Sequence, residues 1–327
     1  MQRMHDGKTL RAWLAGGAAL VLAAIAPGVQ AGSFPVTVQD DRGIAVTIEQ
    51  QPKHVAALWM AAADLLVALD LPVLGITTYE GRRPVYLGDA VADAIDLGDI
   101  TAPNLELMST LDIDLTAGMT HYNAPYAEEI EKFGGFVTFD GFDLDTSLSA
   151  IERLGAALGA AEKAKALNAD FLALADELAA QAPAEPRSVV FIWSFQDTLY
   201  GYQDNILTAQ LIGKLGTRNP LGFNEDAETP DNAFVVLETE DLLALDPDVI
   251  LMHISHGGAA KYNPAYERLT AYESGRIYSV GHQYSQPSGP IARELVLREA
   301  AHLIYPETFP APDMPDLARA TPVEFAR

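Results

Sequence analysis

The sequence predicts an α/β protein of two similar lobes joined by one long α-helix. Glu106 to Leu115 and Glu240 to Val249 share one motif, in which Leu, Asp and Asp follow the Glu by five, six and eight residues. The second copy begins 134 residues after the first (240 against 106), and an apolar run ending in Trp recurs at that offset, at Trp59 and Trp193. A repeat of this length is too long for a solenoid unit. It therefore indicates two lobes with a cleft between them, and we expect the function to lie there.

In the first lobe, short apolar runs alternate with helical stretches after an initial hairpin around Asp40-Asp-Arg-Gly43. The expected strands are 36–38, 45–48, 55–59, 73–76, 114–117 and 136–139, and the expected helices are 61–69, 105–111 and 127–133. Strands that alternate with helices favour a parallel sheet with right-handed crossovers, as in a Rossmann-like lobe.

The segment from 147 to 182 is rich in Ala, Leu, Glu and Lys and predicts helix, with a break at Gly155 and Gly159. Residues 161–180 alone would form a helix of about 30 Å at 1.5 Å per residue, which Pro183 and Pro186 end. One long helix between two lobes restrains hinge motion, so we expect the lobes to tilt only slightly around a ligand.

The second lobe repeats the alternation, and its tail is expected to be irregular beyond Tyr305 because four prolines follow between 306 and 315. Its expected strands are 188–193, 249–253 and 276–280, and its helices are 207–215, 240–245 and 291–304. The expected organisation is a cleaved signal peptide at 1–31, a first lobe at 34–145, a linking helical segment at 146–183 and a second lobe at 184–327.

The first 31 residues have the pattern of a secretory signal. Lys8 and Arg11 precede an apolar run from 13 to 26, and Val29-Gln-Ala31 supplies small residues for cleavage. The run is shorter than the roughly 20 residues of a membrane span. The chain has no cysteine, which excludes disulfides, thiolate metal sites and a lipid anchor on Cys. These features predict a protein of the periplasm.

The formal net charge of −24 argues against nucleic acid or anionic lipid as a partner. The chain also lacks the G-x-S-x-G, Walker and G-x-G-x-x-G motifs, so we expect no enzyme. Two alternatives remain open. His256-Gly-Gly258 could serve a secreted hydrolase as an oxyanion loop, and His253 and His256 could bind a metal with His121 or His282.

Aromatic and basic residues concentrate in loops that follow predicted strands, where open α/β sheets bind ligands. They are Trp59, Tyr79, Arg82, Arg83, Tyr86 and Tyr122 in the first lobe, and Trp193, Tyr200, Tyr202, Tyr262 and Tyr284 in the second. Aromatic walls with a few hydrogen-bond donors suit a large, partly apolar ligand. Glu106 and Glu240 open matching helices, so we expect them to meet basic residues of a partner.

The chain resembles the periplasmic substrate-binding proteins of ABC importers for ferric siderophores and cobalamin. The motifs that carry the resemblance are Val55–Trp59, Leu65-Leu-Val-Ala-Leu69, Pro72-Val-Leu-Gly75, Asp96-Leu-Gly98, Pro103-Asn-Leu-Glu106, Leu111-Asp-Ile-Asp114, the stretch from Glu240 to Asp248, Gly275-Arg-Ile-Tyr278, Ser288-Gly289 and Tyr305-Pro-Glu307. The resemblance implies the class III fold of these proteins, two α/β lobes joined by one long helix. It also implies that Glu106 and Glu240 dock on arginines of an inner-membrane permease with its cytoplasmic ATPase.

The resemblance further implies the ligand and its contacts. The ligand would be a ferric siderophore bound by a monomer without cofactor or protein-bound metal. Arg83, or Arg82 in an alternative register, and Tyr122 would bond the oxygens around iron, while Trp59, Trp193 and Tyr284 would pack on apolar parts. Asn232 or a neighbour replaces a Trp of the hydroxamate binders, so hydroxamate, citrate and catecholate chelates all stay open. Haem, cobalamin or a metal ion is the alternative ligand.

Overall fold

The computed structural model describes residues 34–227, 229, 233–255 and 258–326. The predicted signal peptide at 1–31, Asn232 and His256 lie outside these residues, so the expectations placed on them stay expectations. In the part of the chain that is described, no helix combines the length and the apolar character that a membrane crossing requires.

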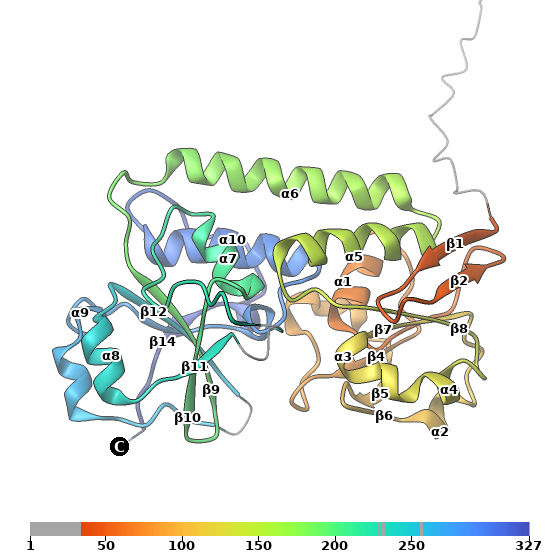
Figure 1. Cartoon of the computed structure of the whole chain (residues 1–327), viewed down its shortest axis with the longest axis horizontal. Helices are drawn as coiled ribbons and strands as arrows, with labels where there is room; N and C mark the ends of the chain where they lie inside the picture. Colours follow the sequence, from red (N-terminus) through yellow and green to blue (C-terminus); the bar gives the residue numbers. More distant parts are fainter. Residues whose placement is uncertain (1–33, 228, 230–232, 256–257, 327) are drawn as a thin grey trace, which may run out of the picture. The chain divides into compact units, whose positions relative to one another are not determined.

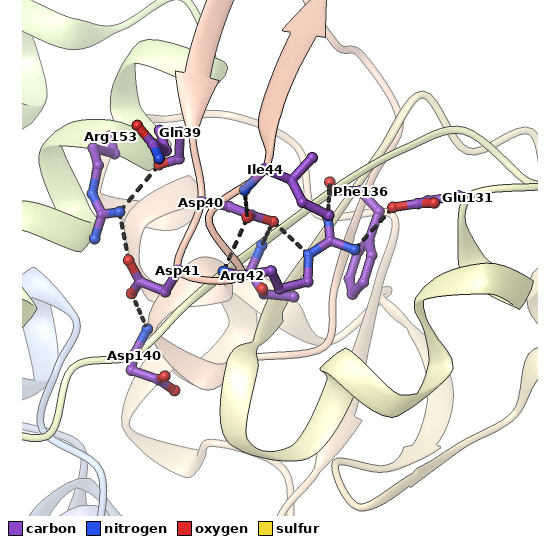
Figure 2. Close-up of polar contacts among 10 residues, drawn as sticks. Gln39, Asp40, Asp41, Arg42, Ile44, Glu131, Phe136, Asp140 and Arg153 are labelled. Atoms are coloured by element: carbon purple, nitrogen blue, oxygen red, sulfur yellow. Dashed lines mark hydrogen bonds and ion pairs between the residues drawn. The ribbon is translucent and has the colours of Figure 1, made fainter.

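An antiparallel hairpin of β1 (Val36–Gln39) and β2 (Ala45–Ile48) begins the fold, as predicted. Its turn is fixed to the first lobe by Arg42, which donates to Glu131 at 2.8 Å and to the carbonyl of Phe136 at 3.1 Å (Figure 2). The guanidinium also lies over the Phe136 ring, 4.6 Å from its centroid. The hairpin is therefore attached to the outermost strand of the first sheet.

The same turn fixes the segment that leads from the sheet toward the cleft. The Asp41 carboxylate accepts from Arg153 at 2.6 Å and from the backbone N–H of Asp140 at 2.8 Å (Figure 2). Asp140 is thus held at the end of the last strand, beside residues that line the cleft.

The first lobe contains a six-stranded sheet in the order β6-β5-β4-β3-β7-β8. The strands are β3 (Val55–Ala57), β4 (Gly75–Thr78), β5 (Ile95–Asp99), β6 (Ala102–Pro103), β7 (Leu115–Met119) and β8 (Gly135–Phe139). All neighbouring pairs are parallel except β5 with β6. The sequence pattern does not predict β5, because its acidic and glycine residues have low β propensity. The predicted parallel sheet is otherwise present.

Helices cover both faces of this sheet, and the strand residues alternate between the two resulting cores. Val55 and Ala57 point to the core that includes α1 and α5, whereas Ala56 and Leu58 point to the core beneath α2 and α4. The helices are α1 (Met60–Ala68), α2 (Leu105–Met108), α3 (Thr120–Asn123), α4 (Ala127–Ile130) and α5 (Leu144–Ala157), with 3₁₀ helices η1 (Val85–Val91) and η2 (Ala124–Tyr126).

The long linking helix is present as α6 (Ala161–Gln181), close to its predicted bounds, and it packs along α5 and α10 (Figure 1). Gly155 does not break the helix, contrary to expectation, since α5 continues through it. A Cβ at Gly155 would lie 2.2 Å from Ala164 Cβ, so glycine permits the close contact of α5 with α6. The turn between the two helices is made at Gly159, whose φ is +73°.

The second lobe contains a mixed sheet in the order β11-β10-β9-β12-β13-β14. Its strands are β9 (Val189–Phe195), β10 (Thr198–Tyr202), β11 (Phe234–Val236), β12 (Val249–Ile254), β13 (Ile277–Ser279) and β14 (Thr321–Pro322). Only β9, β12 and β13 are parallel to one another. The antiparallel β10, β11 and β14 are a correction to the expected alternation, and β14 gives order to the tail that was expected to be irregular.

One face of the second sheet packs against α6, α7 and α10, and the other packs against α8 and α9. The helices of this lobe are α7 (Leu207–Gly213), α8 (Thr239–Leu245), α9 (Thr270–Glu273) and α10 (Pro290–Ile304), with 3₁₀ helices η4 (Pro264–Arg268), η5 (His282–Tyr284) and η6 (Asp316–Ala318).

The C-terminal segment returns to the first lobe. Ala292, Met314 and Ala318 belong to the core cluster of the first sheet. The buried carboxylate of Asp64 on α1 accepts the backbone N–H groups of Ile291 and Ala292, both at 2.8 Å. The start of α10 is therefore bonded to α1, which gives the two lobes a second connection beside α6.

The sequence repeat corresponds to the same structural unit in both lobes. Val55 pairs with Leu115 between β3 and β7, and Val189 pairs with Val249 between β9 and β12. In each lobe the last Asp of the motif accepts the backbone N–H that precedes the central strand. Asp114 accepts from His54 at 2.9 Å, and Asp248 accepts from Ser188 at 2.7 Å.

Candidate functional site

The candidate site is a cavity of about 190 Å³ whose wall combines both lobes. Most of its lining residues lie at or just beyond the ends of strands, as the parallel strand arrangement predicts, and Ile206, Leu207 and Thr208 lie at the start of α7. They are Tyr79, Met119, Tyr122, Gly141, Phe142, Trp193, Tyr202, Ile206, Leu207, Thr208, Phe234, Ser285, Gln286, Pro287 and Ser288. A more open depression of about 700 Å³ lies beside the start of α5 and lacks such an aromatic wall.

An aromatic layer on β9, β10 and β11 forms the wall of the second lobe. Trp193 is paired with Tyr200 in the antiparallel register, and their rings lie 5.3 Å apart. Tyr202 is paired with Phe234, with a ring separation of 4.9 Å. Because residues two apart share a face of a strand, this hairpin presents aromatic side chains together. Tyr200 and Tyr202, which we expected in a loop, belong to a strand.

A polar chain crosses from one lobe to the other next to this wall. The indole N–H of Trp193 donates to Ser255 Oγ at 2.8 Å, and Ser255 Oγ donates to Glu80 Oε1 at 2.7 Å. The second oxygen of Glu80 lies 3.7 Å from His253 Nε2. Ser255 and His253 belong to the second lobe, whereas Glu80 belongs to the loop after β4. This loop therefore closes the cavity by contact with the opposite lobe.

The loop that carries Glu80 has a constrained backbone. Glu80 has a φ of +52° and Gly81 a φ of +68°. The turn is closed by two backbone hydrogen bonds of 3.0 Å between Tyr79 and Arg82. Left-handed backbone at a residue other than glycine is costly and concentrates at functional positions. Here it directs the Glu80 side chain toward Ser255.

His282 stacks between Tyr79, at 5.2 Å between ring centroids, and His253, at 5.8 Å. It is 4% exposed, and neither ring nitrogen has a hydrogen-bond partner among the described residues. Burial, together with the neighbouring His253, lowers the pKa of His282 to about 4. The imidazole is therefore uncharged at neutral pH.

Tyrosine hydroxyls from both lobes lie close to one another near this stack. Burial raises the pKa of Tyr79 and of Tyr202, and the nearby Tyr122 and the Glu80 carboxylate raise both further. The phenols of Tyr79 and Tyr202 therefore stay protonated and can donate hydrogen bonds to ligand oxygens.

Of the predicted ligand residues, Trp193 and Tyr122 line the cavity. Arg82 is exposed at the loop, close enough to His282 for its charge to lower the pKa of that imidazole, after burial and His253. The expectation that Arg83 faces the ligand is corrected by the structure. The Arg83 guanidinium donates to the carbonyls of Val91, Ala92 and Ala94, so it holds the η1 segment and does not face the cavity.

Trp59 and Tyr284 are also corrections, because they are 1% and 0% exposed and belong to core clusters. Trp59 lies behind the cavity wall, where a Cβ added at Gly141 would come within 3.1 Å of its ring. Burial raises the pKa of Tyr284 well above its usual range, and the adjacent Glu299 raises it further. Both rings support the wall and do not form its surface.

Glu106 and Glu240 lie where the repeat predicts, in the first turns of α2 and α8, and both are exposed. Asn104 caps the first of these helices through the N–H of Leu107, and Glu238 caps the second in a capping box. Because other residues act as caps, neither Glu106 nor Glu240 is needed to start its helix.

Glu80 and Ser255 are the site residues that the sequence pattern does not reveal. An acid before glycine in a loop is common, and a serine at a strand end carries no signal without a partner. His253 and His282 do adjoin the cavity, but the described residues contain no group of three or more His, Cys, Asp or Glu side chains arranged to hold a metal ion. His256 lies outside the described residues.

A family model described as periplasmic binding protein matches residues 55–284. The chain is 26% identical over 288 residues to the uncharacterized ABC transporter substrate-binding lipoprotein YvrC of Bacillus subtilis, with 84% of this chain and 87% of that protein covered. It is 22% identical over 251 residues to the Fe(3+)-citrate-binding protein YfmC of the same organism, covering 74% and 76% of the two chains.

Solved structures share the fold. The triscatecholate siderophore binding protein FeuA from Bacillus subtilis, complexed with ferri-bacillibactin, superposes with a TM-score of 0.70 at 18% identity, covering 83% of this chain and 98% of that one. SirA of Staphylococcus aureus, complexed with staphyloferrin B, gives a TM-score of 0.62 at 20% identity, covering 80% and 96%. These findings confirm the predicted resemblance and the predicted fold of two α/β lobes.

Proposed function

Because the chain belongs to the periplasmic binding protein family, we propose that it captures a ferric-siderophore complex between its lobes and delivers it to an ABC importer of the inner membrane. The observation that carries the proposal is the cavity wall, in which Tyr122, Tyr79 and Tyr202 offer hydroxyls beside the ring of Trp193. The names of the relatives support it, since YfmC is a Fe(3+)-citrate-binding protein and FeuA binds a siderophore.

The chemistry of the wall fits a chelate whose iron is already enclosed. Siderophore oxygens fill the coordination sphere of iron(III), so a carrier needs only to contact the outside of the complex. Phenolic donors bond to the ligand oxygens, and the aromatic layer packs on apolar parts. No reaction and no protein-bound metal or cofactor is part of this proposal. The protein would act as a monomer in the periplasm, after removal of residues 1–31.

The cavity of about 190 Å³ is smaller than the roughly 300–1,000 Å³ of pockets that enclose drug-sized ligands. A ferric siderophore therefore enters only when the lobes separate. Separation breaks the hydrogen bond between Glu80 and Ser255, and ligand contacts replace it. Glu106 and Glu240, one on each lobe, are the proposed contacts with basic residues of the permease.

A tryptophan-fluorescence titration tests the ligand assignment. Residues 32–327 form one compact unit and retain two tryptophans, Trp59 and Trp193. The panel is ferrioxamine B, ferrichrome, ferric citrate, a ferric catecholate, haem, cobalamin and zinc. We expect at least one iron chelate to bind with a Kd below about 10 μM. Trp193→Phe should remove most of the signal and Trp59→Phe should retain it. Binding only of zinc, haem or cobalamin in that range would contradict the proposal.

A further inference from the structure

Three hydroxyl groups and one indole in the cavity lining already donate hydrogen bonds within the protein. The hydroxyls belong to Thr208, Ser285 and Ser288, and each donates to a backbone carbonyl at 2.7 or 2.8 Å. The indole N–H of Trp193 donates to Ser255 Oγ at 2.8 Å. A ligand can therefore receive these four donors only if an existing hydrogen bond is broken.

The amide of Gln286 is in a different condition. Gln286 lines the cavity and is 9% exposed, and its Oε1 atom is buried without a hydrogen-bond partner among the described residues. No other described residue of the lining has a buried side-chain nitrogen or oxygen that lacks a partner. A buried carbonyl oxygen without a donor is costly, and folded proteins seldom contain one. The missing donor therefore indicates a ligand group that the cavity is built to receive.

The backbone that carries this amide is fixed on both sides. Ser285 bonds to the carbonyl of His282 through its N–H, at 3.1 Å, and through its hydroxyl, at 2.8 Å. The carbonyl of Ser288, two residues after Gln286, accepts from the hydroxyl of Ser147 on α5 at 2.9 Å. The residue between is a proline, which restricts the backbone of Gln286. A ligand therefore gains the amide at a small cost in conformational entropy.

The chemistry of Gln286 Oε1 limits the ligand groups that can pair with it, because a carbonyl oxygen only accepts hydrogen bonds. The oxygens around iron in a ferric siderophore are acceptors too, and they match the protonated phenols of Tyr79 and Tyr202. A donor for Gln286 must therefore come from the skeleton that joins the chelating groups. A secondary amide in that skeleton has an N–H for this purpose, whereas a ferric citrate complex contains no N–H at all.

Given ferric-siderophore capture, on which this inference rests, we propose that Gln286 selects chelates whose skeleton contains secondary amides, by accepting a hydrogen bond from a ligand N–H. The lobes separate to admit the ligand, and its N–H then supplies the donor that the closed protein lacks. A chelate without an N–H leaves Oε1 buried and unpaired in the complex. Sites that pair a buried polar group with the ligand strongly reject analogues without the matching group.

Ferrioxamine E and its triester analogue provide the test. Both are neutral macrocyclic trihydroxamates with the same iron core, but the analogue has an ester oxygen in place of each amide N–H and offers no donor. Affinities for the protein are measured by calorimetry at pH 7. For the wild type we expect the amide chelate to bind at least about tenfold more tightly than the ester chelate, since the ester leaves a buried acceptor unpaired.

Two substitutions at one position test the role of the acceptor oxygen. Gln286→Met has a similar length but no carbonyl, and it should reduce the amide-to-ester affinity ratio about tenfold. Gln286→Glu keeps an acceptor oxygen, so it should retain the preference for the amide chelate whatever its effect on the affinity for both. Gln181→Met, at an exposed position at the end of α6, is the control and should leave the wild-type ratio unchanged.

The stability of Gln286→Met separates a ligand contact from a structural role. Oε1 has no partner in the ligand-free protein, so the substitution removes no hydrogen bond of that atom and should leave the unfolding midpoint close to that of the wild type. An unchanged amide-to-ester ratio in this variant would overturn the proposal. A lowered midpoint beside the unchanged ratio would assign Gln286 to the fold instead.

The ligands alone distinguish the failure of this inference from the failure of the proposed function. Binding of the ester chelate by the wild type as tightly as the amide chelate would overturn the selection and leave siderophore capture in place. So would binding of ferric citrate or a ferric catecholate when neither form of ferrioxamine E binds, or tighter binding of ferric citrate than of ferrioxamine E. Absence of binding by all four chelates would overturn the proposed function and this inference together.

Discussion

His282 makes the stability of the protein depend on pH. Its imidazole is stacked between Tyr79 and His253, is 4% exposed, and has a pKa lowered to about 4. In the unfolded chain a histidine has a pKa near 6.5. Between these two values the unfolded state binds more protons than the folded state, so the stabilisation is complete above about pH 6.5 and is lost as the pH falls toward 4.

We therefore predict that replacing His282 by Gln, which does not titrate, reduces the loss of unfolding free energy as the pH falls below 7. Wild-type unfolding free energy should fall by about 3 kcal/mol more than that of His282→Gln between pH 7 and pH 4. Urea unfolding across this range measures the difference. Parallel profiles for wild type and His282→Gln would contradict the assignment.

Single residues were only partly predictable from the sequence. Trp193 and Tyr122 line the cavity as expected, because each follows from a strand position. Arg82 and Arg83 are adjacent in an irregular loop, and no periodicity indicates which one turns inward. The orientation of the Arg83 side chain is set by its hydrogen bonds to the carbonyls of Val91 and Ala94, and only the folded backbone brings these groups together. Glu80 can be recognised as a site residue only from its hydrogen bond to Ser255 on the other lobe.

At the scale of elements, the repeated Asp residues stabilise the start of each central strand. Asp114 Oδ2 accepts the backbone N–H groups of Lys53 and His54, at 2.7 and 2.9 Å. Asp248 Oδ2 accepts from the N–H and the hydroxyl of Ser188, at 2.7 and 2.8 Å. The carboxylates thus join the chain before β3 to β7 and the chain before β9 to β12. This contact explains why both copies of the motif keep an acid at this position.

We predict that Asp248→Ala lowers the unfolding free energy by about 1–3 kcal/mol, since it leaves the part-buried N–H and hydroxyl of Ser188 without a protein acceptor. Asp114→Ala should lower it by about 1 kcal/mol, since the N–H groups that it leaves, of Lys53 and His54, are exposed to water. Asp→Asn at either position retains one acceptor oxygen and should cost less. Asp112→Ala is the matched control within the same motif, because its side chain is 94% exposed, and it should stay within about 0.5 kcal/mol of wild type. Urea unfolding measures all of them. A loss at Asp112 as large as that at Asp114 would refute this role.

Most of the elements could be predicted because their periodicity is strong. Apolar runs indicate the buried parallel strands β3, β7, β9 and β12, and the Ala-rich composition indicates α6 almost to the residue. The antiparallel β10 and β11 were missed, since β10 (Thr-Leu-Tyr-Gly-Tyr) has no clear alternation of apolar and polar side chains and β11 (Phe-Val-Val) has only three residues. They are held by pairing with β9, a contact distant in sequence. That pairing also builds the aromatic wall, so its shape could not be predicted.

At the scale of the whole molecule, α6 and the start of α10 provide two of the connections that restrain the lobes. The first is α6, which packs along α5 and α10 (Figure 1). The second is the buried contact of Asp64 with the start of α10, where a Cβ at Gly289 would lie only 2.3 Å from the Asp64 carboxyl carbon. Neither connection is on the polar chain from Trp193 to Glu80. Ligand entry can therefore break the Glu80 contact while the opposite connections stay intact.

The proposed docking on a permease would involve both lobes, because each carries one exposed acid of the repeat. Glu106 and Glu240 form no ion pair with any described residue, and neither lies in the cavity lining. Charge complementarity across an interface acts mainly on association and orientation, so reversing these charges should repel basic permease residues. We predict that the double variant Glu106→Lys with Glu240→Lys loses most ligand transport, and that each single variant loses part of it.

The double variant should bind the chelate with wild-type affinity, since neither position belongs to the cavity lining. Uptake of radiolabelled ferric chelate by cells that carry the matching permease measures transport, and fluorescence titration of the purified variant measures affinity. Glu128→Lys reverses an exposed charge in the first lobe outside the repeat and should transport normally. If the double variant lost affinity, these acids would belong to the pocket or the fold. If it transported normally, the docking surface would lie elsewhere. The matching acids would then reflect only the similar first turns of α2 and α8.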